Sequence, residues 1–298
     1  MISARSGTSS RGVLQGAAGV LGGMRAEAGK GYAFIERNIY LTKRYWAWEV
    51  FWVVYNIVNA LSVTFIAASL QKTIPSVTFT QAQINFAILY LTIGTAIWTF
   101  VSVVFDNVTE MVTMERWEGT IEYTFMAPVS RVTHMFGACA FALLHGFFLT
   151  VLQLLVVGLF FHLDLSTANW GAALVILAAC SISLVGLGTI SAVLPMLFTE
   201  RGAQMAYIIR AIMLLVSGVY YPVSVLPGWL QAIAKITPTT YALDGLRQSI
   251  QLGKGLDQLA YDMWPLLICG VVSVPLGLFI FNRAERYAKR TGRLKRNG

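Results

Sequence analysis

Charged residues are scarce in this 298-residue chain: 12% of the sequence is Asp, Glu, Lys or Arg, whereas 56% is hydrophobic. A soluble domain typically has about 25% charged residues. A single soluble core of this length would have too few polar side chains to cover its surface. Together with a mean hydropathy of +0.65, this composition excludes an ordinary soluble enzyme and indicates an integral membrane protein.

Cysteine and histidine are also rare, with three of each. The cysteines (Cys139, Cys180 and Cys269) all lie in apolar runs, which excludes a secreted disulfide scaffold. The histidines His134 and His162 would lie about 42 Å apart along one helix, so they cannot share a metal ion. We therefore predict neither a metal site nor catalytic residues.

A phosphate-binding loop is missing as well. The segments Gly29-Lys30-Gly31 and Gly253-Lys254-Gly255 lack both the following Ser or Thr and the upstream glycine of that motif. The chain is therefore not expected to hydrolyse a nucleotide by itself.

Long apolar runs are present, and a membrane-crossing helix needs about 20 such residues. Six runs qualify: Trp46–Leu70, Ile84–Phe105, Met135–Phe161, Trp170–Phe198, Met205–Tyr221 and Trp264–Phe281. The fifth is the weakest, because Arg210 interrupts it and Pro222 follows it. No run alternates with a period of two residues, so we predict an all-α integral membrane fold with six transmembrane helices rather than a β-barrel.

The basic residues set the expected orientation. All but four of the 22 Lys and Arg residues lie before the first span, after the sixth, or around the 2–3 and 4–5 connections. The exceptions are Lys72, Lys235, Arg247 and Lys254. This bias and the even number of spans both predict a multi-pass protein of the cell membrane with both termini in the cytoplasm.

The regions outside the spans have their own character. Residues 1–24 are rich in Ser, Gly, Ala and Arg, which predicts a flexible tail. Residues 25–45 suit an amphipathic helix that lies in the cytoplasmic interface and contacts anionic membrane lipid. The six-span domain covers residues 46–282, and residues 283–298 form a basic cytoplasmic tail. Nucleic-acid binding by this tail is not expected.

Acidic residues gather between the second and third spans. Glu115, Glu118 and Glu122 have i, i+3, i+7 spacing and would share one face of a helix that Pro128 ends. We predict one short amphipathic helix parallel to the membrane, with an apolar face opposite the acidic one. No neighbouring nucleophile, histidine or metal ligand supports acid–base chemistry there, so a docking surface for another protein is the preferred interpretation.

The segment after the fifth span is too apolar for an external loop and too rich in proline for a span. Polypeptide at membrane depth must satisfy its own backbone hydrogen bonds. We therefore predict two short re-entrant or interfacial helices, at about 228–235 and 239–251.

These two segments resemble the coupling region and the outer motif of ATP-binding-cassette (ABC) type-2 permeases, a resemblance that covers roughly residues 25–285. The coupling run reads Glu-Arg-x-x-Gly-Thr-Ile-Glu and then Pro-Val-Ser-Arg, and the outer run begins Ser-Gly-Val-Tyr-Tyr-Pro. The coupling matches are Glu115, Arg116, Gly119, Thr120, Glu122 and Pro128, with Glu118 on the same predicted face. The outer matches are Gly218, Pro222, Leu226, Pro227, Pro238, Tyr241, Ala242, Gly245 and Arg247.

The resemblance implies a transporter subunit without an ATPase site of its own. A second permease copy would complete the pore, as a homodimer or as a heterodimer with a sister permease. Two cytoplasmic ATPase subunits would dock on the coupling helices and hold ATP and Mg, while this chain binds no cofactor.

By the same resemblance, spans 1, 2 and 5 line a path at the dimer axis. The candidate path residues are Glu49, Asn56, Asn59, Trp98 and Arg210. For Glu49 and Arg210 the alternative is a structural pair with each other, and for the two asparagines it is helix–helix hydrogen bonding. The expected function is export of an amphipathic drug-like molecule or a lipid. The alternatives are a polysaccharide or glycolipid permease of the same family, and a channel or secondary transporter that does not use ATP.

Overall fold

The structure is a computed structural model that describes residues 27, 29–74, 76–127, 129–198 and 200–293. All regular elements within these ranges are helices. The predicted tail 1–24, the proline at position 128 and the last five residues of the basic tail lie outside the described residues. The all-α prediction is confirmed for the part of the chain that is described.

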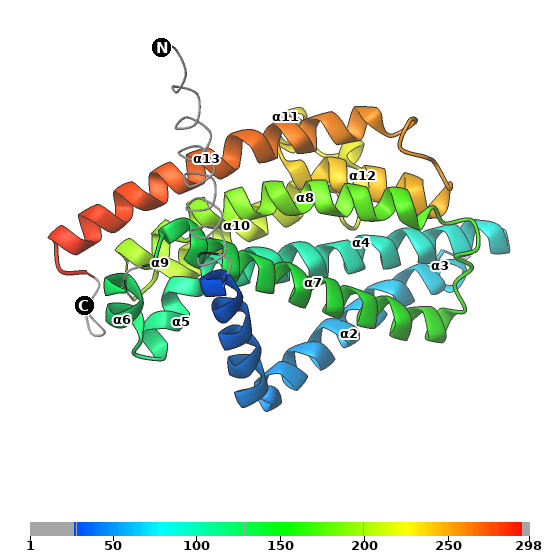
Figure 1. Ribbon diagram of the computed structural model, residues 1–298. Coiled ribbons are helices and arrows are strands. Elements are labelled where there is room, and N and C mark those ends of the chain that lie inside the picture. The colour runs from blue at the N-terminus through cyan, green and yellow to red at the C-terminus, as the bar shows by residue number, and fades with distance from the viewer. Residues whose placement is uncertain (1–26, 28, 75, 128, 199, 294–298) are drawn as a thin grey trace, which may run out of the picture.

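Five helices are long and apolar enough to cross a membrane. They are α2 (Trp46–Ala68), α4 (Gln81–Thr109), α7 (Arg131–Phe161), α8 (Trp170–Ser191) continued by α9 (Val193–Leu197), and α13 (Ala260–Arg290). Figure 1 shows four of these, α4, α7, α8 and α13, running side by side along the length of the molecule. These helices coincide with five of the six predicted spans, and the chain is a multi-pass membrane protein.

The remaining predicted span, Met205–Tyr221, forms the shorter helix α10 (Gly202–Ser217). It ends four residues earlier than predicted, because Gly218 adopts a left-handed backbone with φ of 76°. Glycine takes this conformation at low cost and commonly terminates helices. Whether α10 crosses a membrane stays a prediction.

The core lies around α4 and α8. Ile93, Phe100 and Val104 of α4 pack in one buried cluster with Ile176 and Leu184 of α8. A polar contact joins α8 to α13, where the Ser183 hydroxyl donates to the Leu266 carbonyl over 2.7 Å. Helix α2 is peripheral by contrast and buries only Ala60, Thr64 and Ala67.

Short helices cap the two ends of this bundle. One end holds α5 (Met111–Trp117) and α6 (Ile121–Met126), and the other holds α3 (Leu70–Thr73), the 3-10 turn Val223–Val225, α11 (Gly228–Ala234) and α12 (Pro238–Gln251). Figure 1 shows α5 and α6 far from α3 and α12. We call these the α5–α6 end and the α12 end. The two helices predicted between the last two spans are confirmed as α11 and α12.

A further helix covers residues 29–44 and turns at Tyr45 into α2, so that the two helices form a V (Figure 1). The open side of the V faces α7. The predicted helix at 25–45 is therefore confirmed over 29–44, and its interfacial position stays a prediction.

Candidate functional site

The acidic segment at the α5–α6 end is not one helix, as the spacing predicts, but two. Helix α5 ends at Trp117, Gly119 adopts a left-handed φ of 73°, and α6 begins at Ile121. The chain reverses at this glycine, so Glu115, Glu118 and Glu122 do not share one helical face. The single amphipathic helix is therefore a wrong prediction, and each of the three carboxylates has a different environment.

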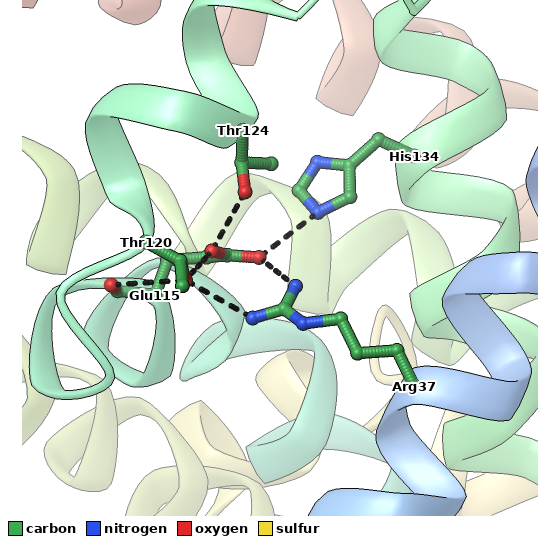
Figure 2. A network of polar contacts seen from close by, with 5 residues as sticks. All are labelled: Arg37, Glu115, Thr120, Thr124 and His134. Atoms are coloured by element: carbon green, nitrogen blue, oxygen red, sulfur yellow. Dashed lines mark hydrogen bonds and ion pairs between the residues drawn. The ribbon is translucent and has the colours of Figure 1, made fainter.

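Glu115 points into the protein and is only 3% exposed. Figure 2 shows its carboxylate surrounded by Arg37, Thr120, Thr124 and His134. Arg37 and Thr120 donate short hydrogen bonds to it, Thr124 donates one of 2.9 Å, and His134 Nε2 lies 3.6 Å away. These side chains belong to the helix 29–44, the α5–α6 turn, α6 and α7. We call these five residues the Glu115 cluster.

The cluster keeps Glu115 ionised. Burial raises the pKa of Glu115, but the nearby His134 and the hydrogen bonds from Arg37 and Thr120 outweigh burial and lower the pKa to about 2. A buried carboxylate is stable only when it is paired in this way. The negative charge therefore holds the helix 29–44 against α5, α6 and α7.

Arg116, the next residue, attaches α5 to α9 and to the chain that follows α13. Its guanidinium donates to the backbone carbonyls of Pro195, Met196 and Arg293, the last two over 3.0 and 2.8 Å. Pro195 and Met196 belong to α9, and Arg293 follows α13. Motif matching selects Arg116 but does not reveal that its partners are the ends of two spans.

The other side of the α5–α6 turn is open. Trp117, Tyr123 and Met126 are 64%, 80% and 82% exposed, and Glu122 is exposed beside them. Glu118 instead accepts a hydrogen bond of 2.8 Å from Tyr45 and lies 3.6 Å from Arg44. The turn thus has an inner side fixed by ionic contacts and an outer side of exposed aromatic and apolar groups.

At the α12 end, the outer motif builds a second buried charged site. Arg247 is 6% exposed and donates to the carbonyls of Gly218 and Val219 over 2.9 and 2.6 Å. Its guanidinium lies over the Tyr90 ring, 3.6 Å from the centroid. These carbonyls are at the C-terminal end of α10, where no backbone donor of the helix remains for them. Arg247 therefore caps α10 from α12, and we call this contact the Arg247 cap.

The other outer-motif residues set helix boundaries. Pro222 and Pro227 immediately precede the 3-10 turn and α11, and Pro238 is the first residue of α12, the position where proline is most favourable. The Tyr241 hydroxyl donates to the Lys235 carbonyl over 2.8 Å and closes the turn between α11 and α12.

Of the predicted path residues, the two charged ones do not pair with each other. Glu49 of α2 lies 2.6 Å from His145 Nε2 of α7, and Arg210 of α10 forms an ion pair with Asp106 of α4. The Glu49–Arg210 pair is therefore a wrong prediction. The two side chains point to different neighbouring helices, and the structure brings neither to the other.

The uncharged path residues are dispersed. Asn56 donates to the Trp52 carbonyl of its own helix over 2.9 Å, and Asn59 is exposed. Trp98 is half-buried against the core of α4 and α8. Sequence reasoning overlooked Arg37 and His134 as partners of Glu115, because they lie on separate helices and no spacing connects them.

The geometry can be compared with known families. Residues 32–250 match the family model of the ABC-2 type transporter. A search of curated proteins found no significant match. The family match covers most of the chain, including the Glu115 cluster and the Arg247 cap. Five apolar helices of membrane-spanning length agree with it. The chain therefore belongs to the ABC-2 type transporter family and is a membrane permease component of an ABC-type transporter.

Proposed function

We propose that this permease is the membrane half of an exporter that separate ATPase subunits drive, with an amphipathic small molecule or lipid as its cargo. In this proposal α10 is a sixth span, and the α5–α6 end faces the cytoplasm at the cell membrane. At 1.5 Å per residue the 16 residues of α10 reach about 24 Å. That is close to the hydrocarbon thickness of about 30 Å.

We assign ATPase docking to the outer side of the α5–α6 turn. Trp117, Glu122, Tyr123 and Met126 are exposed there, and aromatic and methionine side chains are enriched at protein interfaces. Glu115, Arg116, Gly119 and Thr120 shape this turn from inside. Pro128 lies outside the described residues and stays a predicted coupling residue. In this proposal ATP and Mg are bound by the partner ATPase subunits.

The contacts of the turn suggest how a push on it would spread. A displacement of the turn would move the helix 29–44 and α7 through the Glu115 cluster. The same displacement would move α9 and the end of α13 through Arg116. Helix α9 is connected to α10 through residues 198–201. The single observation that supports this proposal best is the buried, ionised Glu115, which joins segments far apart in the sequence at one point.

The path itself is assigned to α2, α4 and α10. The apolar side chains of Ile208, Ile212 and Leu215 on α10 are exposed, as are Phe51 and Tyr55 on α2. A second permease copy would cover this surface and enclose the path, as a homodimer or a heterodimer. Asn59 and the aromatic groups of α2 are then the groups nearest to cargo.

The proposal is tested by cross-linking and by transport. A cysteine at Tyr123 should cross-link to a co-expressed ATPase subunit, whereas a control cysteine at Ile236, which is equally exposed at the α12 end, should not. Transport of a fluorescent amphiphile into inverted vesicles should require ATP. Transport that continues without any nucleotide hydrolase, or cross-linking only at Ile236, would contradict the proposal.

A further inference from the structure

A cleft of about 520 Å³ opens between α2 and α7, and the helix 29–44 lines one end of it. Its walls are apolar: Val50 and Val53 of α2 face Phe148 and Leu152 of α7. Thr42 and Lys43 of the helix 29–44 line its mouth, together with Trp46. The cleft lies outside the bundle core and away from the proposed docking surface on the α5–α6 turn.

We propose that this cleft binds one acyl chain of an anionic phospholipid, whose phosphate contacts Lys43. The bound molecule is a resident lipid and not cargo. This inference requires that α2 and α7 cross a bilayer and that the helix 29–44 lies at its surface, so it is independent of the ATPase partner and of what is exported.

The charge at the mouth favours an anionic headgroup. Among the cations described on the helix 29–44, Lys30, Arg37 and Arg44 each lie within 4 Å of a carboxylate, whereas Lys43 has no such partner and is exposed. A lysine at the membrane surface attracts anionic lipid. Its hydroxyl-bearing neighbour Thr42 adds a hydrogen-bond donor for a phosphate oxygen.

The other charged group of the cleft defines how deep the headgroup can lie. Glu49 also lines the cleft and is bound to His145, 2.6 Å away. Its carboxylate repels a phosphate, so the phosphate stays at Lys43 and only the acyl chain passes Glu49. Beyond His145 the cleft follows α7 to Leu152, about 10 Å along a helix, without another charged residue in its lining.

The shape of the cleft favours a flexible chain over a second protein. In a bilayer, apolar side chains gain little by leaving lipid for a partner helix, since both surroundings are equally apolar. An empty cleft would leave its walls without van der Waals contacts. An acyl chain fills an irregular gap and keeps its headgroup at the level of Lys43.

The test uses the full chain purified in detergent, without ATPase subunits. Native mass spectrometry measures binding of phosphatidylglycerol and of phosphatidylcholine. We expect the wild type to retain phosphatidylglycerol preferentially. Lys43→Gln should weaken its binding about five-fold, the effect of one lysine at an anionic surface. Leu152→Trp, which fills the cleft, should reduce retention of both lipids.

Two matched variants serve as controls. Lys72→Gln removes an exposed lysine at the α12 end, and Leu155→Trp enlarges an exposed side chain of α7 that does not line the cleft. Neither should change lipid retention. Equal binding of both lipids by the wild type, or equal losses in Lys43→Gln and Lys72→Gln, would overturn the proposal. So would an intermolecular disulfide through a cysteine at Phe148, which would show a second copy in the cleft. None of these outcomes depends on transport.

Discussion

Each end of the molecule buries a charged residue of one of the two motifs, and the two ends stabilise that residue differently. Glu115 at the α5–α6 end is held by side chains from separate segments: Arg37, His134 and two threonines. Arg247 at the α12 end is held by the two backbone carbonyls that directly follow α10 and by the ring of Tyr90. One site is a junction of side chains and the other is a cap on a helix end.

This difference indicates different roles. The carbonyls of Gly218 and Val219 are buried just after α10 and accept hydrogen bonds from Arg247, so the Arg247 cap is expected to support the fold. Side chains on separate helices can shift together or separate, so the Glu115 cluster is expected to transmit movement. The predictions below test this separation between stability and coupling.

The largest effect is expected from Arg247→Ala. Two carbonyls would then be buried without a donor, at about 1–3 kcal/mol each, and the midpoint of thermal unfolding in detergent should fall by many degrees. Arg247→Lys retains the charge but loses the two-carbonyl geometry and should lie between Arg247→Ala and the wild type. An unchanged unfolding midpoint in Arg247→Ala would show that the cap is not structural.

The second effect concerns acid stability. The folded-state pKa of Glu115 is about 2, below its ordinary value of about 4.5. Its stabilisation is therefore fully present above about pH 4.5 and is lost as the pH falls toward 2. At about 1.4 kcal/mol per unit it amounts to about 3 kcal/mol. Glu115→Gln should have a flatter stability profile than the wild type below pH 4.5, and exposed Glu122→Gln should follow the wild type.

The third effect separates coupling from folding. Glu115→Gln keeps the size of the side chain but replaces one accepting oxygen by an NH2 donor and loses the ionic contact with Arg37. Hydrogen bonds between charged groups are roughly twice as strong as neutral ones. At pH 7 we expect a folded permease whose ATP-driven transport is about ten-fold slower. Glu36→Gln, at an exposed glutamate of the helix 29–44 outside the cluster and outside the docking surface, is the matched control. Equal transport by Glu115→Gln and wild type would remove the cluster from the proposed mechanism.

Regular features of the fold were predictable from sequence because they follow local rules. Long apolar runs gave five helices of spanning length, and prolines marked the starts of α11 and α12. The helix break at Gly119 was not predictable in this way. A glycine inside a helical pattern costs only about 1 kcal/mol, so the i, i+3, i+7 spacing of the acidic residues remained compatible with one helix.

Long-range pairing was the part that local rules could not provide. Glu49 and Arg210 both lie near the same end of the bundle, but the rotation of each helix decides its neighbour, and the partners are His145 and Asp106. The partners of Glu115 were equally hidden, since Arg37 and His134 lie on two different helices. Motif resemblance selected Glu115 and Arg247, yet only the packing distinguishes a junction from a cap.

The smallest effect gives the sharpest form of the comparison, because it removes one secondary contact from each site. Thr124→Val deletes the hydroxyl that donates to Glu115 over 2.9 Å, and Tyr90→Leu deletes the ring over Arg247. Each contact is worth about 1–2 kcal/mol, so the two variants should be destabilised to a similar degree. If the sites differ in role, Thr124→Val should also slow ATP-driven transport several-fold at equal protein level, while Tyr90→Leu should not. Because the stability losses are matched, a transport defect shared by both variants would trace to reduced folding and would count against a separate coupling role for the Glu115 cluster.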